Sequence, residues 1–201
     1  MSARVVVFDL GGVLIDWNPR HLFRKLVPDP AEVEELLATV CTQGWNEQQD
    51  AGRALAEATA ELVALHPHRA ELIRCYYDRW DEMMAGAIDG TVALLEELDG
   101  RGVPLYALTN FSAETFPHAR RRFPFLSRFR AIVMSGEERL VKPDPRFYRL
   151  LLDRHRLVPG ETLFIDDSAV NVEAARALGM AGHHFRDPAA LRAELAGHGL
   201  L

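Results

Sequence analysis

Short, fully apolar runs recur along the chain, and each one ends in polar or glycine residues. They are Val5–Phe8, Leu105–Leu108, Ala131–Met134, Leu163–Ile165 and a weaker run at His183–Phe185. Runs of this length without a polar face are typical of strands buried on both sides, and such strands occur in parallel sheets covered by helices. The pattern therefore predicts an α/β fold built on a Rossmann-like parallel sheet.

Helical patterns connect these runs. Apolar residues at helical spacing predict helices over Gly90–Leu98, Pro145–His155 and Val170–Leu178, and Gly179 is expected to end the last of them as a C-terminal cap. Strands that alternate with helices in this way are connected as βαβ units, which places the predicted helices on the two faces of the sheet.

The connection between the first two runs, Asp16 to Ala87, is much longer than a crossover requires. It carries further helical patterns over Pro30–Thr39, Ala54–Leu65 and Ala70–Met84. We therefore predict a core domain of residues 1–15 and 88–201, with a small all-helical domain of residues 16–87 inserted after the first strand. The last of these patterns carries an aromatic stripe of Tyr76, Tyr77 and Trp80. We interpret this stripe as core packing and not as a surface that binds a ligand.

Polar residues with catalytic potential follow four of the predicted strands. In chain order they are Asp9, Thr109, Asn110, Lys142, Asp166 and Asp167. Ligands of an open parallel sheet bind beyond the carboxyl ends of its strands, so we expect these side chains to converge. Any one of them alone is more typical of a turn or a helix cap. Their joint occurrence is what indicates a site.

The residue types indicate phosphoryl chemistry. Adjacent carboxylates such as Asp166 and Asp167 repel each other unless a cation neutralises them, and magnesium prefers hard oxygen ligands of this kind. A carboxylate such as Asp9 can attack phosphorus and form an aspartyl-phosphate. Since nucleophile and phosphate are both anionic, a cation and Lys142 have to offset their repulsion. Thr109 and nearby backbone N–H groups are expected to hold the phosphate oxygens.

Bulk properties narrow the class of protein. The 201 residues suffice for a core domain with a small insertion. A net charge of −6 gives no general attraction to nucleic acid or to an anionic membrane. Two cysteines are too few for a metal cluster or a disulfide framework. No apolar stretch has the length of a signal peptide or a membrane span, so we expect a cytoplasmic protein that acts on a small-molecule phosphate ester.

Four segments together resemble the motifs of the haloacid dehalogenase (HAD) superfamily. Val5 to Leu14 (VVVFDLGGVL) resembles its first motif, Leu108 to Asn110 its second, Val141 to Pro143 its third, and Phe164 to Ser168 with Asn171 its fourth. The resemblance spans essentially the whole chain, and it implies a HAD-type core with a type 1 helical cap. Within the family, the chain looks most similar to small sugar-phosphate phosphatases of the α-glucose-1-phosphate phosphatase kind.

The resemblance also implies roles for individual residues. Asp9 would be the nucleophile and a magnesium ligand, together with the backbone carbonyl of Gly11 and the carboxylate of Asp167. Asp166 would bind magnesium through water or would be the partner of Lys142.

The remaining roles concern the phosphoryl group. Thr109 and Asn110 would bind it, and Lys142 would steady both the phosphate and the Asp9 carboxylate. Asn171 would brace the loop around the acidic pair.

Gly11 departs from the family's pattern, in which a second aspartate stands two residues after the nucleophile. The carbonyl of that aspartate binds magnesium, and its side chain protonates the leaving oxygen and later activates water. Glycine retains the carbonyl and loses the acid. A positioned general acid–base contributes about 10²–10⁴ in rate. Three outcomes follow: a preference for esters with good leaving groups, replacement of the acid by Asp16 or by a cap residue such as Asp50 or Glu47, or slow turnover. For sugar phosphates we hypothesise replacement or slow turnover.

The segment from Gln43 to Gly52 lies where related caps present a loop to the substrate. Trp45 and Asn46, with Gln48, are candidate contacts to a sugar or another polar leaving group. An ordinary helix–helix connection is the alternative interpretation of this segment.

Other functions remain open on the sequence. The 2-haloacid dehalogenases use the same aspartate without magnesium and tolerate a non-acid at the position of Gly11, but the pair Asp166 and Asp167 would repel an anionic haloacid. In phosphoacceptor receiver domains the acidic pair follows the first strand, which reverses the order found here. A non-catalytic phosphate binder is conceivable because of Gly11 alone.

Overall fold

The computed structural model describes residues 2–201 and contains a five-stranded parallel sheet. Its strands, in the order β5-β4-β1-β6-β7, are β5 (Ala131–Met134), β4 (Leu105–Thr109), β1 (Val5–Phe8), β6 (Thr162–Asp166) and β7 (Ala181–His184). The central strand β1 pairs in parallel with both β4 and β6. The predicted fold class is confirmed, with small shifts at the ends of the strands.

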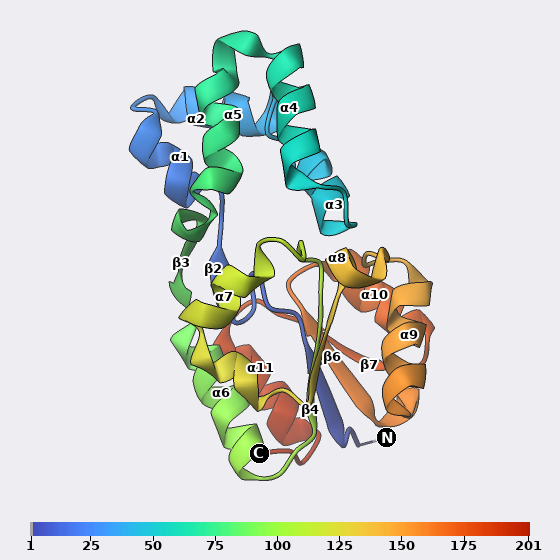
Figure 1. Cartoon of the computed structure of the whole chain (residues 1–201). Helices are drawn as coiled ribbons and strands as arrows, with labels where there is room; N and C mark the ends of the chain where they lie inside the picture. The colour runs from blue at the N-terminus through green and yellow to red at the C-terminus, as the bar shows by residue number, and fades with distance from the viewer. Residues whose placement is uncertain (1) are drawn as a thin grey trace.

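Helices cover both faces of this sheet. They are α6 (Asp89–Gly100), α7 (Phe116–Arg122), α8 (Ser135–Glu138), α9 (Pro145–His155), α10 (Ala169–Ala177) and α11 (Pro188–Gly197), with 3-10 turns at Pro124–Arg128 and Pro159–Glu161. Helices α6 and α11 lie on one face, and α9 and α10 lie on the other (Figure 1). Within residues 2–201, none of the helices combines the length and apolar character needed to cross a membrane.

Strand β1 is buried on both of its faces. Val6 and Phe8 join the larger apolar cluster, which includes Leu94 of α6, while Val7 joins the cluster around Phe147 of α9. Neighbouring side chains of a strand point to opposite faces, so both faces of β1 have to be apolar. This burial makes the end of β1 a rigid platform for the residue that follows.

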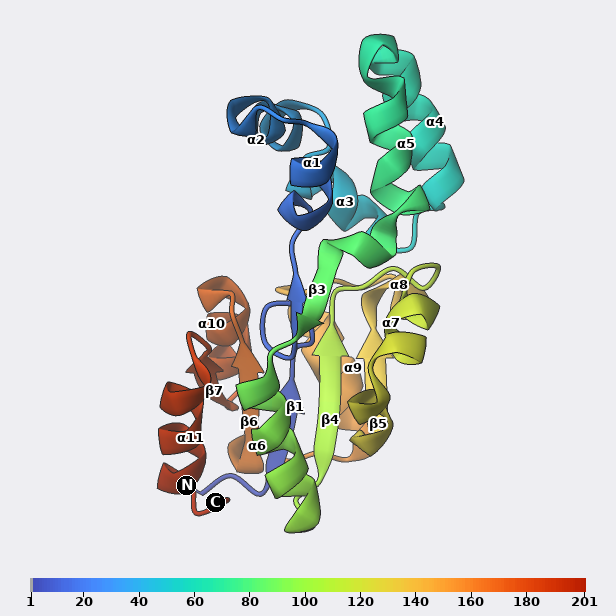
Figure 2. The ribbon, with the colours of Figure 1, turned by 90° about the vertical axis from the view of Figure 1, so that its left-hand side faces the viewer.

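An insertion separates β1 from the rest of the core and stands over the carboxyl ends of the strands (Figures 1 and 2). Its helices are α1 (Arg20–Leu26), α2 (Pro30–Thr39), α3 (Gln43–Asp50), α4 (Leu55–Leu65) and α5 (Ala70–Asp78), with 3-10 turns at Pro67–Arg69 and Trp80–Met83. We refer to residues 16–87 as the insertion and propose these limits for it as a domain.

The insertion is not entirely helical, which corrects the sequence prediction. Strands β2 (Ile15–Trp17) and β3 (Met84–Ala87) pair antiparallel where the insertion joins the core. The helix predicted to reach Met84 ends at Asp78. Strands of three or four residues carry too little alternation to be recognised from a sequence. The chain enters the insertion through β2 and returns to the core through β3 (Figure 2).

The aromatic stripe packs inside the insertion, as predicted. Tyr76 and Trp80 are buried, and the rings of Tyr77 and Trp80 stack with centroids 5.8 Å apart. Trp45 of α3 lies edge-on to Tyr76 at a centroid distance of 5.1 Å. Large aromatic side chains dominate the packing of so small a set of helices, because each one buries a large apolar area. The stripe thereby holds α3 against α5.

Candidate active site

A pocket of about 710 Å³ lies between the insertion and the carboxyl ends of the strands. The core contributes Asp9, Gly11, Gly12, Asn110, Lys142 and Asp167 to its lining, and the insertion contributes Arg20, Glu34, Asn46, Glu47 and Asp50. Asp9 directly follows β1, and its backbone N–H donates to the carbonyl of Ile165 at 2.8 Å, as if continuing the strand pairing. The convergence predicted from strand ends therefore occurs in the structure.

Lys142 links two of the carboxylates. Its Nζ lies 2.8 Å from Oδ2 of Asp9 and donates to Oδ2 of Asp166 at 2.7 Å, and its side chain is almost entirely buried. Burial lowers the pKa of Lys142, but the charges and hydrogen bonds of Asp9 and Asp166 outweigh that effect and raise it above its ordinary value. Lys142 is therefore a permanent buried cation between the two acids.

Asp166 is saturated with hydrogen bonds. Its Oδ1 accepts from the backbone N–H of Ser168 at 2.8 Å, and Nδ2 of Asn171 lies 3.0 and 3.1 Å from its two oxygens. With Lys142 as a further donor, this carboxylate is held in one orientation. Asn171 therefore bonds to Asp166, as its predicted role as a brace requires, and of the two roles considered for Asp166 the geometry favours that of partner to Lys142.

Asn110 holds the backbone of Lys142. Its Oδ1 accepts from the N–H of Lys142 at 2.8 Å, and its Nδ2 donates to the carbonyl of the same residue at 3.0 Å. Through these two hydrogen bonds the side-chain amide of Asn110 positions the backbone of Lys142. Asn110 also lines the pocket. A strand end at β4 thus orients the lysine that follows β5.

Three carboxylates gather around a single buried cation. Oxygens of Asp9, Asp166 and Asp167 lie within 4.8 Å of one another. Burial, with smaller contributions from the charges of Asp166 and Asp167, raises the pKa of Asp9 to about 7 against the opposing attraction of Lys142. Partial desolvation, followed by the charge of Asp166, also raises the pKa of Asp167. The cluster carries more negative charge than its lysine balances, which favours a further cation.

Gly12 allows the first loop to approach the acidic pair. Its φ of +70° lies in the left-handed region, and a Cβ built on it would stand 2.2 Å from Oδ2 of Asp167. Neither the backbone conformation nor the space suits another residue. The glycine at this position is therefore a condition for bringing the loop after β1 next to the loop after β6.

Three predicted substrate contacts, Thr109, Trp45 and Gln48, are not among the residues that line this pocket. Thr109 is buried at the end of β4, and Trp45 is buried against Tyr76 and Tyr77. Trp45 lies on the inner side of α3, where its ring packs against the rings of Tyr76 and Tyr77. Asn46, the neighbouring candidate, does line the pocket.

Residues 3–179 match the family model of the haloacid dehalogenase-like hydrolases. This match covers most of the chain and contains every strand end that contributes to the pocket. The chain belongs to this family. It is accordingly a hydrolase of the HAD type, as the resemblance of the four motifs implied.

Related proteins include phosphatases. The chain is 29% identical over 203 residues to the sesquiterpene phosphatase astK of Aspergillus oryzae, covering 96% of this chain and 94% of that one. It is 30% identical over 189 residues to a phosphoglycolate phosphatase of Yersinia pestis, covering 89% and 78%. A HAD family enzyme of Bacteroides thetaiotaomicron, solved with magnesium and inorganic phosphate, shares the fold with a TM-score of 0.68 at 21% identity, covering 92% and 94%.

Sequence reasoning missed one wall of the pocket in this family member. It is formed by Trp17, the last residue of β2, and by Asn18, Pro19 and Arg20, which follow that strand. Nε of Arg20 donates to Oε1 of Glu34 at 2.7 Å. The Asn-Pro pair was an available signal, because it marks a turn that redirects the chain. No local signal marked Glu34.

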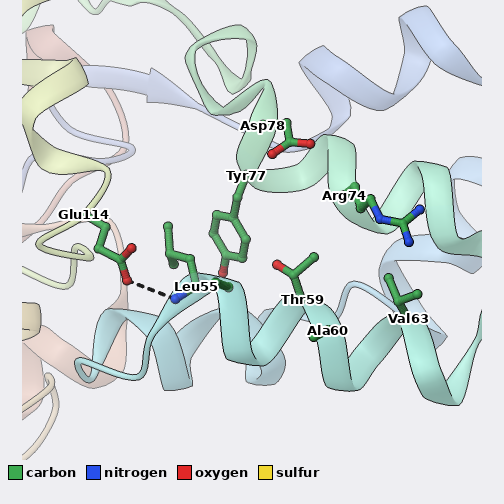
Figure 3. Close-up of a pocket in the computed structure, with 9 residues that line it drawn as sticks. Leu55, Thr59, Ala60, Val63, Arg74, Tyr77, Asp78 and Glu114 are labelled. Atoms are coloured by element: carbon green, nitrogen blue, oxygen red, sulfur yellow. Dashed lines mark hydrogen bonds between the residues drawn. The ribbon is translucent and has the colours of Figure 1, made fainter.

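A second groove, of about 610 Å³, lies between α4 and α5 and reaches Glu114 of the core (Figure 3). The acids and the lysine of the HAD motifs do not line this groove. Glu114 accepts a hydrogen bond from the backbone N–H of Leu55 at 2.9 Å. Ala54, which precedes α4, has no side-chain acceptor, so Glu114 caps this helix from the core. The contact ties the insertion to the core.

Proposed function

We propose that this hydrolase is a magnesium-dependent phosphatase that cleaves the phosphate monoester of a small metabolite, such as a sugar phosphate, through an aspartyl-phosphate on Asp9. The observation that carries the proposal is the clustering of three carboxylates, Asp9, Asp166 and Asp167, of which the first two contact the buried Lys142. Such a cluster suits a reaction in which a cation and a phosphate dianion are bound together. The relatives named as phosphatases support it.

The donor set suits magnesium. Hard oxygen ligands are what this ion prefers, with few of them from the protein. Asp9, Asp167 and the backbone carbonyl of Gly11 would hold it, while Asp166 would remain the partner of Lys142, because its oxygens already serve Lys142 and Asn171. When bound, the ion supplies positive charge beside the phosphoryl oxygens.

The residues of the chain then carry two displacement steps. Asp9 is oriented for attack because its Oδ1 accepts from the N–H of Leu10 at 2.7 Å while its Oδ2 contacts Lys142. A bond forms between a carboxylate oxygen of Asp9 and phosphorus as the bond from phosphorus to the leaving oxygen breaks. Water then attacks phosphorus, which releases inorganic phosphate and restores the Asp9 carboxylate. Lys142 offsets negative charge in both steps.

Hydrolysis of p-nitrophenyl phosphate is expected to require magnesium. After dialysis against EDTA the initial rate should fall to the uncatalysed background, and added magnesium should restore it, because the acidic cluster otherwise repels the phosphate. Absorbance of released nitrophenolate is the measurement. A full rate in EDTA, checked against residual metal by elemental analysis, would contradict the proposed role of the ion. A panel of hexose phosphates, phosphoglycolate and prenyl monophosphates would then define the substrate.

Dehalogenation is the competing activity for the same nucleophile. The excess of negative charge around Asp9 disfavours it, since an anionic haloacid would meet Asp166 and Asp167. Chloride release from 2-chloropropionate, assayed beside the phosphatase reaction, separates the two. Chloride release that is independent of magnesium, without phosphate release, would favour the dehalogenase.

Gly12→Ala is expected to weaken activation by magnesium about 10–100-fold, the range found when residues that orient metal ligands are changed. The added methyl group collides with the carboxylate of Asp167, so that carboxylate has to move. The measurement is the magnesium concentration for half-maximal rate, with thermal unfolding as a check on folding. Gly197→Ala is the matched control, because its Cβ meets nothing within 4 Å. Equal magnesium dependence in both variants would refute the role of Gly12.

A further inference from the structure

The loop after β1 leaves open the space that an acidic side chain would fill. A Cβ built on Gly11 meets no atom within 4 Å. Gly11 and Asp9 also line a small cavity of about 80 Å³, and Asn46 and Asp50 of the insertion line the same cavity. A carboxyl group from the insertion is thus placed on the same cavity as the nucleophile and the vacant position.

Asp50 is held in place by a chain of buried hydrogen bonds. Its Oδ2 accepts from Nδ2 of Asn46 at 2.9 Å, and Oδ1 of Asn46 accepts from the hydroxyl of Tyr77 at 3.0 Å. The Tyr77 oxygen in turn accepts from Nε2 of Gln49 at 3.1 Å. The predicted substrate contact Asn46 therefore has its side-chain amide committed to orienting Asp50.

The core fixes the same residue from the other side. The hydroxyl of Ser135 donates to the backbone carbonyl of Asp50 at 2.6 Å, while its oxygen accepts from the N–H of Phe111 at 2.9 Å. Ser135 follows β5 and Phe111 comes two residues after β4, so both lie at the carboxyl edge of the sheet, and Phe111 also lines the small cavity. The position of Asp50 relative to Asp9 is set by this contact between insertion and core.

We propose that Asp50 is the general acid and base of the phosphatase reaction and replaces the acid absent at Gly11. The inference rests on the proposed function. In the first step the Asp50 carboxyl gives its proton to the leaving oxygen as the bond from that oxygen to phosphorus breaks, which yields a neutral alcohol and the Asp50 carboxylate. In the second step that carboxylate takes a proton from the water that attacks the aspartyl-phosphate.

The surroundings of Asp50 favour such a role. Burial raises its pKa to about 7, and the charges of Glu47 on the same helix and of Asp9 in the core act in the same direction. The hydrogen bonds from the Ser112 backbone and from Asn46 oppose the shift. A carboxyl group with a pKa near neutrality can serve as acid in one step and as base in the next.

The two other candidates from the sequence are placed differently. Asp16 lies 2.9 Å from Nε2 of His21, is half exposed and lines neither the pocket nor the small cavity. Glu47 lines the pocket but not the small cavity with Asp9. Of the three, only Asp50 lines both the pocket and the small cavity, each of which also contains Asp9.

The test compares two esters whose leaving groups differ in their need for a proton. In Asp50→Asn, kcat/KM for a hexose phosphate is expected to fall about 10²–10⁴-fold, because a sugar alkoxide is a poor leaving group. For p-nitrophenyl phosphate the fall in kcat/KM should be less than about tenfold, because nitrophenolate leaves without protonation. Slow water activation should also produce a burst of nitrophenolate equal to the enzyme concentration.

The ratio of the two kcat/KM values does not depend on how much enzyme is folded, so a partly unfolded variant still gives an answer. Asp16→Asn is the matched control and should leave the ratio unchanged. In Gly11→Asp/Asp50→Asn the hexose phosphate kcat/KM should rise at least about tenfold above Asp50→Asn, since a carboxyl group returns to the vacant space.

If Asp50→Asn leaves the ratio of the two kcat/KM values unchanged, the assignment of Asp50 is overturned. A changed ratio in Glu47→Gln together with an unchanged ratio in Asp50→Asn would assign the role to Glu47 instead. Failure of the wild-type protein to hydrolyse either ester with magnesium present would instead overturn the proposed function. The two failures are therefore distinguishable.

Discussion

Asp9→Asn is expected to lower phosphatase turnover by about 10⁴-fold or more, the scale on which removal of a covalent nucleophile acts in other enzymes. An amide oxygen is a far weaker nucleophile than a carboxylate, so the first bond to phosphorus does not form. The fold should persist, because the amide can still accept from the N–H of Leu10 at the end of β1. Burial already raises the pKa of Asp9, so a neutral group is compatible with the site.

The measurement is steady-state hydrolysis of p-nitrophenyl phosphate, combined with acid quenching and mass spectrometry for a phosphorylated enzyme. The wild type should show a mass increase of one phosphoryl group, and Asp9→Asn should not. Asp16→Asn, an exposed aspartate outside the pocket, is the control. A phosphorylated species that persists in Asp9→Asn would assign the nucleophile to another residue.

Lys142→Met is expected to destabilise the protein by about 3–5 kcal/mol and to abolish activity, because removal of one partner leaves buried charges uncompensated. Nζ of Lys142 lies between Asp9 and Asp166, at 2.8 and 2.7 Å, and its side chain is 1% exposed. Methionine has a length similar to that of lysine and fills the same space. The loss of stability therefore reflects the missing charge and not a cavity.

The stability loss in Lys142→Met should depend on pH in a defined direction. Without the lysine, the folded-state pKa of Asp9 rises further above that of the unfolded chain. A carboxyl group whose folded pKa is raised favours folding most below its unfolded pKa, and that stability is lost as the pH rises through the folded pKa. The difference between variant and wild type should therefore be largest near pH 8 and smaller near pH 5.

Guanidinium unfolding in EDTA at the two pH values is the measurement. The double variant Lys142→Met/Asp166→Asn should be more stable than Lys142→Met, because it has one uncompensated buried carboxylate fewer. A loss of equal size at both pH values, with no recovery in the double variant, would mean that packing rather than charge accounts for the role of Lys142.

Much of the core could be predicted because its strands are buried on both faces. Val6, Val7 and Phe8 are apolar for that reason, and a continuous apolar run is easy to recognise. Parallel strands end at a common edge, so Asp9, Lys142 and the acidic pair could be assigned to one place without knowing any distance. The convergence of the carboxylates follows from these two facts.

The insertion was less predictable. Strands β2 and β3 are too short to show alternation, and the exposed side chain of Asp16 adds no apolar signal. Trp45 and Asn46 are neighbours in α3, yet one packs on the inner aromatic cluster and the other lines the pocket. Which side of a short polar helix faces the core depends on the elements that pack against it, and these are distant in the sequence.

The sequence by itself determined the class of sheet, the strand ends that carry the chemistry and the absence of an acid at Gly11. Only the tertiary structure decided that Lys142 contacts both Asp9 and Asp166, and that Asp50 rather than Asp16 or Glu47 lines the same small cavity as Gly11. The physical reason is that strand ends converge through regular geometry. The placement of Asp50, in contrast, depends on individual contacts between insertion and core that no local pattern encodes.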